Sequence, residues 1–261
     1  MTLCITWRAQ GAIHLASDSR VTIGTKAADV AIKVLAAPYR IFSAFDVNGN
    51  RSLITSGDIG LCVAGHATGA LSLKESITDV LADIQAMPGY SQVSMDGISD
   101  LVFQAYTVIS KPLIAVLGAK GIATVIVAGH CHGQGKLRAF KLATNASTAA
   151  PSRTEVLLND GDHELLGSGR TAALAALPAS PTNIQYIETL KAVIDNPKVP
   201  GVGGNIQYGT FKGKHFQTYG CAELGSNVHY WRGALDLNDP VFTASNGLVL
   251  CYPLIDPFKH F

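Results

Sequence analysis

Thr2-Leu3-Cys4-Ile5-Thr6-Trp7-Arg8 is the stretch from which the fold of this chain is first predicted. Its apolar residues alternate with polar or smaller ones, and a second apolar stretch, Ala12-Ile13-His14-Leu15-Ala16, follows after Ala9-Gln10-Gly11. Two short alternating runs joined by a glycine-containing turn are typical of a hairpin of half-buried strands. We therefore expect a β-hairpin directly after Thr2.

Thr2 also carries a chemical signal. A small residue behind Met1 lets methionine aminopeptidase expose it as the mature N-terminus. An N-terminal threonine combines a hydroxyl nucleophile with an α-amine base, and such an amine has a pKa of about 7.7–8.0. Most threonines at this position have no catalytic role, so the residues that follow must decide the interpretation.

Charged residues follow the hairpin at regular spacing. In Ser17-Asp18-Ser19-Arg20-Val21-Thr22, the residues Asp18, Arg20 and Thr22 alternate onto one side of an extended chain. Lys33 lies within the apolar run Ala31-Ile32-Lys33-Val34-Leu35, and a buried ammonium needs a counter-ion. Asp18 is the most economical candidate for that counter-ion.

This arrangement resembles the proteasome β-subunit family of N-terminal nucleophile hydrolases. The residues that carry the resemblance, over about positions 2–215, are Thr2, the Asp18-x-Arg20-x-Thr22 block, Lys33, the turn Val63-Ala64-Gly65-His66-Ala67-Thr68-Gly69-Ala70, and Leu166-Gly167-Ser168-Gly169-Arg170. Within the family, the chain most resembles the beta-proteobacterial proteasome homologue, which is related to the ATPase-partnered bacterial peptidase and the ancestral bacterial form. The resemblance implies an α+β fold, a four-layer αββα sandwich.

The resemblance also implies a role for each matching residue. Thr2 would be the nucleophile, with Lys33 as its electrostatic activator and Asp18 as the group that orients and neutralises Lys33. Gly65 would donate its backbone N–H to the oxyanion, and Ser168 would hydrogen-bond near the N-terminal amine. A further catalytic carboxylate is assigned to Asp195, although the loop after it is longer than in the family and has no serine.

Five residues are expected to contact the substrate: Arg20, Val21, Thr22, Val63 and Ala67. Val21, Val63 and Ala67 would line the pocket for the residue before the scissile bond. None of these three is charged, so the sequence predicts a preference for apolar side chains at that position.

Each feature also has a structural explanation. Asp18 and Arg20 at a strand end could be a solvated pair, and Lys33 could extend from an edge strand to water. Gly65 could simply start a helix, and Ser168 could be only an N-cap. The occurrence of all of them in the family's order favours the catalytic interpretation.

Composition limits the class of protein. The chain has 261 residues, a net charge of +1 and 48% hydrophobic residues, which suits a single domain over 1–261 with a core over about 2–215. The segment 216–261 is expected to pack on that core or on a neighbouring subunit. Scattered charges argue against nucleic acid as a partner. Without a signal peptide or a long apolar run, no membrane association is expected, and the protein is expected in the cytoplasm.

Apolar periodicity predicts the other elements. Helices are expected near 67–86, 95–110, 170–178 and 182–195, with strands between them and around Ile206, Tyr208, Phe211 and Phe216. The connection around 43–57 is long, and a loop over the active site is expected there. A second loop is expected over 143–163. His130-Cys131-His132 is expected in a hairpin, without a metal or a cofactor.

The sequence thus predicts a threonine peptidase subunit that hydrolyses peptides or unfolded proteins. As the resemblance implies, it would form a homo-oligomer, a stacked double ring, and an unfoldase partner stays unidentified. Two alternatives are an N-terminal nucleophile amidohydrolase acting on small amides and a catalytically silent shell subunit.

Overall fold

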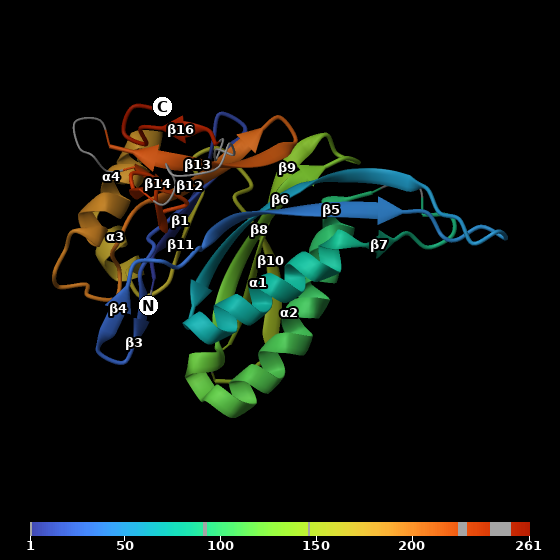
Figure 1. The fold of residues 1–261 in the computed structure, drawn as a ribbon, viewed down its shortest axis with the longest axis horizontal. Helices are drawn as coiled ribbons and strands as arrows, with labels where there is room; N and C mark the ends of the chain where they lie inside the picture. Colours follow the sequence, from blue (N-terminus) through green and yellow to red (C-terminus); the bar gives the residue numbers. More distant parts are fainter. Residues whose placement is uncertain (1, 91–92, 146, 224–228, 241–251) are drawn as a thin grey trace.

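The computed structural model describes residues 2–90, 93–145, 147–223, 229–240 and 252–261. Within them the chain forms two large β-sheets that pack face to face, with helices on both outer sides (Figure 1). The expected four-layer αββα sandwich is confirmed, and its layers follow from three separate apolar interfaces.

The first sheet has the strand order β11-β1-β2-β12-β13-β14-β15, with β16 paired to β13. Its strands are β1 Cys4–Ala9, β2 Ala12–Ser17, β11 His163–Leu166, β12 Gln207–Lys212, β13 His215–Ala222, β14 His229–Trp231, β15 Leu235–Asp236 and β16 Leu254–Ile255. The expected hairpin is therefore β1–β2. Its turn places Gln10 and Gly11 at φ of 51° and 74°, a left-handed pair that suits a tight hairpin.

The second sheet has the order β10-β9-β8-β6-β5-β7. Its strands are β5 Val34–Phe42, β6 Leu53–Gly65, β7 Ile84–Gln85, β8 Ala123–Cys131, β9 Lys136–Thr144 and β10 Pro151–Val156. A small hairpin, β3 Val21–Ile23 with β4 Lys26–Ala28, stands apart from both sheets.

Helices α1 Ala67–Ala82 and α2 Met95–Leu117 cover the second sheet, and the 3-10 turn η1 Gly118–Gly121 ends α2. Helices α3 Arg170–Ala176 and α4 Asn183–Ile194 cover the first sheet. Apolar residues separate into one cluster between the two sheets and one beneath each helix pair. Burial on both faces explains why the strands next to the site are almost continuously apolar.

Three expected elements differ from the structure. The first helix stops at Ala82, and β7 follows with parallel pairing to β5. The second helix continues through Pro112 to Leu117. The expected loop over 143–163 contains β10, which pairs antiparallel with β9.

The connection after Tyr39 does not cover the N-terminal region. β5 and β6 continue as one long hairpin that projects away from the body, at the opposite end of the molecule from the N-terminus (Figure 1). Its outer part exposes Phe45 and Val47. The loop expected to reach over the active site is instead a projecting arm, because continuous antiparallel pairing keeps it extended.

The C-terminal residues pack on the first sheet. β16 pairs with β13, and Phe261 lies against the rings of Trp7, His14 and Tyr208. Burial lowers the pKa of His14 to about 4, so this cluster holds a neutral imidazole at neutral pH. Leu248-Val249-Leu250, the apolar part of the tail, lies outside the described residues.

One helical segment among the described residues, Met95–Gly121, is long and apolar enough to cross a membrane, with a mean hydropathy of 1.5. Its buried residues, which include Ile98, Val102 and Tyr106, belong to the apolar cluster beneath α1 and α2. Of its most apolar window, 17% is buried within the structure, and a single segment of this kind is weak evidence for a membrane span.

Candidate active site

Thr2 lies at the start of β1 and is held by the turn between β11 and α3. Its backbone N–H donates to Ser168 Oγ at 3.3 Å, and its carbonyl accepts from Gly169 N–H at 3.1 Å. Gly167 has φ of +91°, and a Cβ there would lie 2.2 Å from the Thr2 carbonyl oxygen. Only glycine fits this close approach. Thr2 itself is 2% exposed, so it is fixed within the fold.

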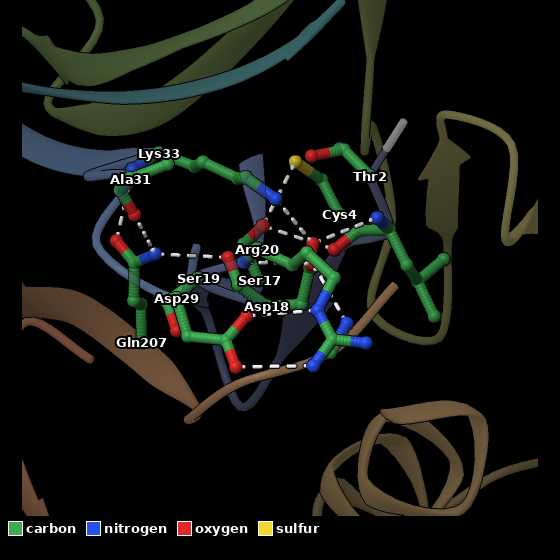
Figure 2. A network of polar contacts seen from close by, with 12 residues as sticks. Thr2, Cys4, Ser17, Asp18, Ser19, Arg20, Asp29, Ala31, Lys33 and Gln207 are labelled. Atoms are coloured by element: carbon green, nitrogen blue, oxygen red, sulfur yellow. Dashed lines mark hydrogen bonds and ion pairs between the residues drawn. The ribbon is translucent and has the colours of Figure 1, made fainter. Parts of the chain in front are cut away.

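Asp18 and Lys33 form a buried ion pair next to Thr2. Lys33 Nζ lies 2.7 Å from Asp18 Oδ1, with side chains 9% and 0% exposed. Figure 2 shows the Lys33 side chain extending across to Asp18, with Thr2 on the same side of the network. The sequence predicted this pairing. The alternative, in which Asp18 pairs with Arg20 in solvent and Lys33 extends to water, differs from the structure.

The Asp18 carboxylate is satisfied by the backbone as well. Oδ1 also accepts from Leu3 N–H at 2.9 Å, and Oδ2 accepts from Arg20 and Gly203 N–H at 3.2 and 3.1 Å. These donors come from three segments of the chain. Charge-assisted bonds of this number stabilise a carboxylate that water cannot reach. Asp18 therefore fixes both the start of β1 and the position of the Lys33 ammonium.

Gln207 is a site residue that sequence reasoning missed. Its Oε1 accepts from the backbone of Lys33 at 2.9 Å and Val34 at 3.2 Å, and its Nε2 donates to the carbonyls of Asp18 at 2.9 Å and Ala31 at 2.7 Å (Figure 2). It is 1% exposed. The sequence did hold a signal for Gln207, an amide side chain between the apolar residues Ile206 and Tyr208. A buried polar side chain in such a run needs hydrogen-bond partners.

Arg20 belongs to the wall of the site without contacting Asp18 through its side chain. The guanidinium forms a bidentate pair with Asp29 at 2.8 and 3.0 Å, and these hydrogen bonds raise the pKa of Arg20. The pair joins the residue before β3 to the residue after β4. Thr22, two residues on, has a buried hydroxyl without a hydrogen-bond partner among the described residues.

A cavity of about 310 Å³ lies beside Thr2. The expected residues Arg20, Val21, Thr22, Lys33, Val63, Gly65 and Ala67 all line it. Further lining residues are Val30, Ala31, Ile32, Ala70, Leu71 and Lys74. Lys74 was not foreseen, so the lining carries more charge than the sequence-based expectation of an apolar pocket allowed.

Gly65 has a structural reason to be glycine. It ends β6 opposite Ala123, and a Cβ at Gly65 would lie 2.7 Å from the Ala123 Cα. The close approach that excludes a side chain is therefore to β8. The backbone of Gly65 still lies on the cavity wall, directly before α1.

Asp195 is not brought to the site. It lies at the C-terminal end of α4, where its carboxylate pairs with Lys191 at 2.6 Å and its side chain is 57% exposed. Asp195 does not line the cavity beside Thr2, so the structure does not bring it to the position that the resemblance implied. Gly203 of the loop after Asp195 reaches the site instead, through its N–H to Asp18.

The four cysteines that the structure describes, Cys4, Cys62, Cys131 and Cys221, are all buried. Cys62 is fully buried, and burial raises the pKa of its thiol well above the ordinary value, so little thiolate forms. No group of three or more His, Cys, Asp and Glu side chains within the described ranges could hold a metal ion.

No protein-family model and no curated protein matches the chain. Among solved structures, it is similar to Anbu (ancestral beta-subunit) from Yersinia bercovieri, with a TM-score of 0.55 and 15% identity over 83% of this chain and 86% of that one. A Gly-1 mutant of Anbu from Hyphomicrobium sp. strain MC1 gives a TM-score of 0.55 and 14% identity over 84% and 85%.

These similarities identify the fold as that of the proteasome-like N-terminal nucleophile hydrolases. They support the broad resemblance drawn from the sequence. They do not support the narrower resemblance to the beta-proteobacterial homologue, which stays a prediction. At this level of identity the likeness concerns the fold alone, so the function is argued from the site.

Proposed function

We propose that the chain is a threonine-type endopeptidase subunit that hydrolyses peptide bonds with Thr2 as the nucleophile. The observation that carries this proposal is the buried Lys33–Asp18 pair in the wall of the cavity that Thr2 also lines. The proposal requires removal of Met1, which lies outside the described residues. A retained Met1 would acylate the amine and leave the hydroxyl without its base.

The reaction begins with proton transfer from the Thr2 hydroxyl to the freed α-amine, directly or through water, while the oxygen attacks the substrate carbonyl carbon. The Lys33 ammonium favours the developing negative charge on that oxygen. Gly65 N–H, at the N-terminal end of α1, stabilises the tetrahedral oxyanion. Collapse of the tetrahedral intermediate breaks the C–N bond of the substrate. The departing amine takes the proton that the α-amine of Thr2 had accepted.

An ester between Thr2 and the acyl part of the substrate remains. Water attacks it with the free amine as base, which releases the carboxylic acid and restores the hydroxyl. Ser168 Oγ, 3.3 Å from the Thr2 nitrogen, orients the amine in both steps. The Asp18 carboxylate holds Lys33 in place and does not itself contact the substrate.

The proposal extends to assembly and location. An exposed peptidase site would cleave cytoplasmic proteins without selection, so we expect a cytoplasmic homo-oligomer, a stacked double ring with Thr2 facing an internal chamber. Peptides or unfolded proteins would enter it, with or without an unfoldase. A monomer by light scattering at micromolar concentration contradicts this part.

The test is covalent labelling of protein whose N-terminus is verified by intact mass. An epoxyketone reacts with both the hydroxyl and the free amine of an N-terminal threonine, so it should add once to chains that start at Thr2. Chains that retain Met1 and the Thr2→Ala variant should not react. Absence of an adduct on chains that start at Thr2 overturns the proposal in favour of a silent shell subunit.

A panel of substrates separates the peptidase from an amidohydrolase. Fluorogenic peptides several residues long should be cleaved, and Thr2→Ala should abolish their cleavage. Turnover of simple amides without turnover of peptides would assign the protein to the small-amide alternative.

A further inference from the structure

The cavity beside Thr2 has an excess of positive charge. Among the described residues that line it, Arg20, Lys33 and Lys74 are cationic and none is an aspartate or glutamate. Apolar residues make up most of the remaining wall, so charges here are less screened than at an open surface. A ligand of matching chemistry would bring a negative charge.

Two of the three cations are already neutralised. Lys33 pairs with Asp18 at 2.7 Å, and Arg20 pairs bidentately with Asp29. Lys74 differs from both, because the nearest ion-pair oxygen in the described structure is Glu75 Oε1 at 3.9 Å. Glu75 is the adjacent residue, and its side chain is 69% exposed to solvent.

Lys74 is nevertheless partly buried. Its side chain is 19% exposed, whereas Lys141 and Lys191, which have carboxylates at 2.8 and 2.6 Å, are 33% and 32% exposed. The Lys74 side chain also lines the cavity beside Thr2. The structure thus holds a poorly paired cation where substrate would lie.

The helix explains why Lys74 points into the cavity. Ala67, Ala70, Leu71 and Lys74 are spaced as one face of α1. Side chains on a helix lean toward its N-terminus, which here is the end next to Gly65. The two alanines leave room for the long Lys74 stem to run back along this face.

We propose that Lys74 selects an acidic side chain, Asp or Glu, in the substrate residue that occupies this cavity next to the scissile bond. The inference rests on the proposed peptidase function and deepens it. The substrate carboxylate would pair with Lys74 Nζ, and its methylene groups would contact Val63 and Ala67. Under this proposal the cavity favours an acidic side chain, where the sequence predicted an apolar one.

The test compares two substrates that differ in charge but hardly in shape, fluorogenic peptides with Glu or Gln before the scissile bond. The purified, N-terminally processed wild type should give a higher kcat/KM for Glu. In Lys74→Met, which keeps the apolar stem, the Glu-to-Gln ratio should fall roughly 10- to 100-fold, the factor for losing a charge-assisted hydrogen bond. Lys74→Arg should retain the preference.

Lys111→Met is the matched control, because Lys111 is an exposed lysine on α2 that does not line the cavity. Its ratio should equal that of the wild type. Two results overturn the role of Lys74 and leave the peptidase function intact, provided that peptides are still cleaved. One is a wild-type Glu-to-Gln ratio near one, and the other is a ratio that Lys74→Met leaves unchanged.

A second readout does not need catalysis. Calorimetric binding of the same two peptides to Thr2→Ala should favour the Glu peptide, and adding Lys74→Met should remove that preference. Equal binding overturns the inference. If no peptide is turned over by the wild type, the proposed activity fails, and this binding ratio still decides the role of Lys74.

Discussion

Two charged clusters in this molecule each hold a buried cation paired with a carboxylate, but only one of the two cations lines the cavity beside Thr2. Lys33 and Asp18 are both nearly inaccessible, and Lys33 also lines a cavity. Arg138 is equally buried, at 8% exposed, but it joins α2, β9 and β10 through Asp96 and Glu155, whose side chains are 50% and 31% exposed.

The difference lies in what each cation faces. The Arg138 guanidinium is shared between two carboxylates and lies 5.0 Å from the centre of the Phe140 ring, and Arg138 does not line the cavity beside Thr2. These bonds hold its pKa above the ordinary value for arginine. Lys33 has one carboxylate and an open space beside it. Burial and pairing alone therefore do not separate the two cations, and the cavity beside Lys33 is the feature that supports its proposed role.

The largest expected effect comes from Lys33→Met. It removes the activating charge and leaves the Asp18 carboxylate buried without its counter-ion, so cleavage should fall by orders of magnitude and the free energy of unfolding by about 3–5 kcal/mol. Urea unfolding and kcat/KM measure the two effects. The double variant Lys33→Met with Asp18→Asn should regain stability without regaining activity, and recovery of both would contradict the catalytic role.

Arg138→Met should have a smaller and purely structural effect. The carboxylates it leaves behind reach solvent, so we expect the free energy of unfolding to fall by only about 1–3 kcal/mol. Cleavage by the folded variant should match the wild type. A loss of activity as large as that of Lys33→Met would show that the two clusters do not differ as described.

The smallest effect concerns pH. The hydrogen bonds from Arg138 lower the pKa of Glu155, so this carboxylate contributes stability above its unfolded value of about 4.5 and loses it as the pH falls through the folded pKa. The stability gap between the wild type and Glu155→Gln should thus shrink on acidification, by less than about 1 kcal/mol because the site is partly solvated. Urea unfolding at several pH values measures the gap, and widening below pH 4.5 contradicts the prediction.

Local signals predicted the elements of the site that lie close together in sequence. Alternation gave the β1–β2 hairpin, and a lysine in an apolar run needed a carboxylate, for which Asp18 was the nearest candidate. Helical periodicity located all four helices. It misplaced two ends, because β7 depends on pairing with β5 and because the packing of α2 on the second sheet tolerates Pro112.

Long-range arrangement could not be read in the same way. Asp195 matched the family in order along the chain, yet its carboxylate lies on the surface and pairs with Lys191. Gln207 lies far from Lys33 in sequence and meets it only because β12 pairs with β2. That pairing depends on cross-strand contacts, which the local sequence around Gln207 does not show.

The sequence by itself determined the first hairpin, the approximate positions of the helices and the need of Lys33 for a carboxylate, because each follows from apolar periodicity or from the cost of burying a charge. The four-layer arrangement was implied by the family resemblance and not by periodicity. Only the tertiary structure decided the rest: that Thr2 and Lys33 line one cavity, that Asp195 is absent from it, and that Lys74 reaches it from α1. The physical reason is that a cavity is a property of packed elements, and its lining comes from segments that no local pattern relates.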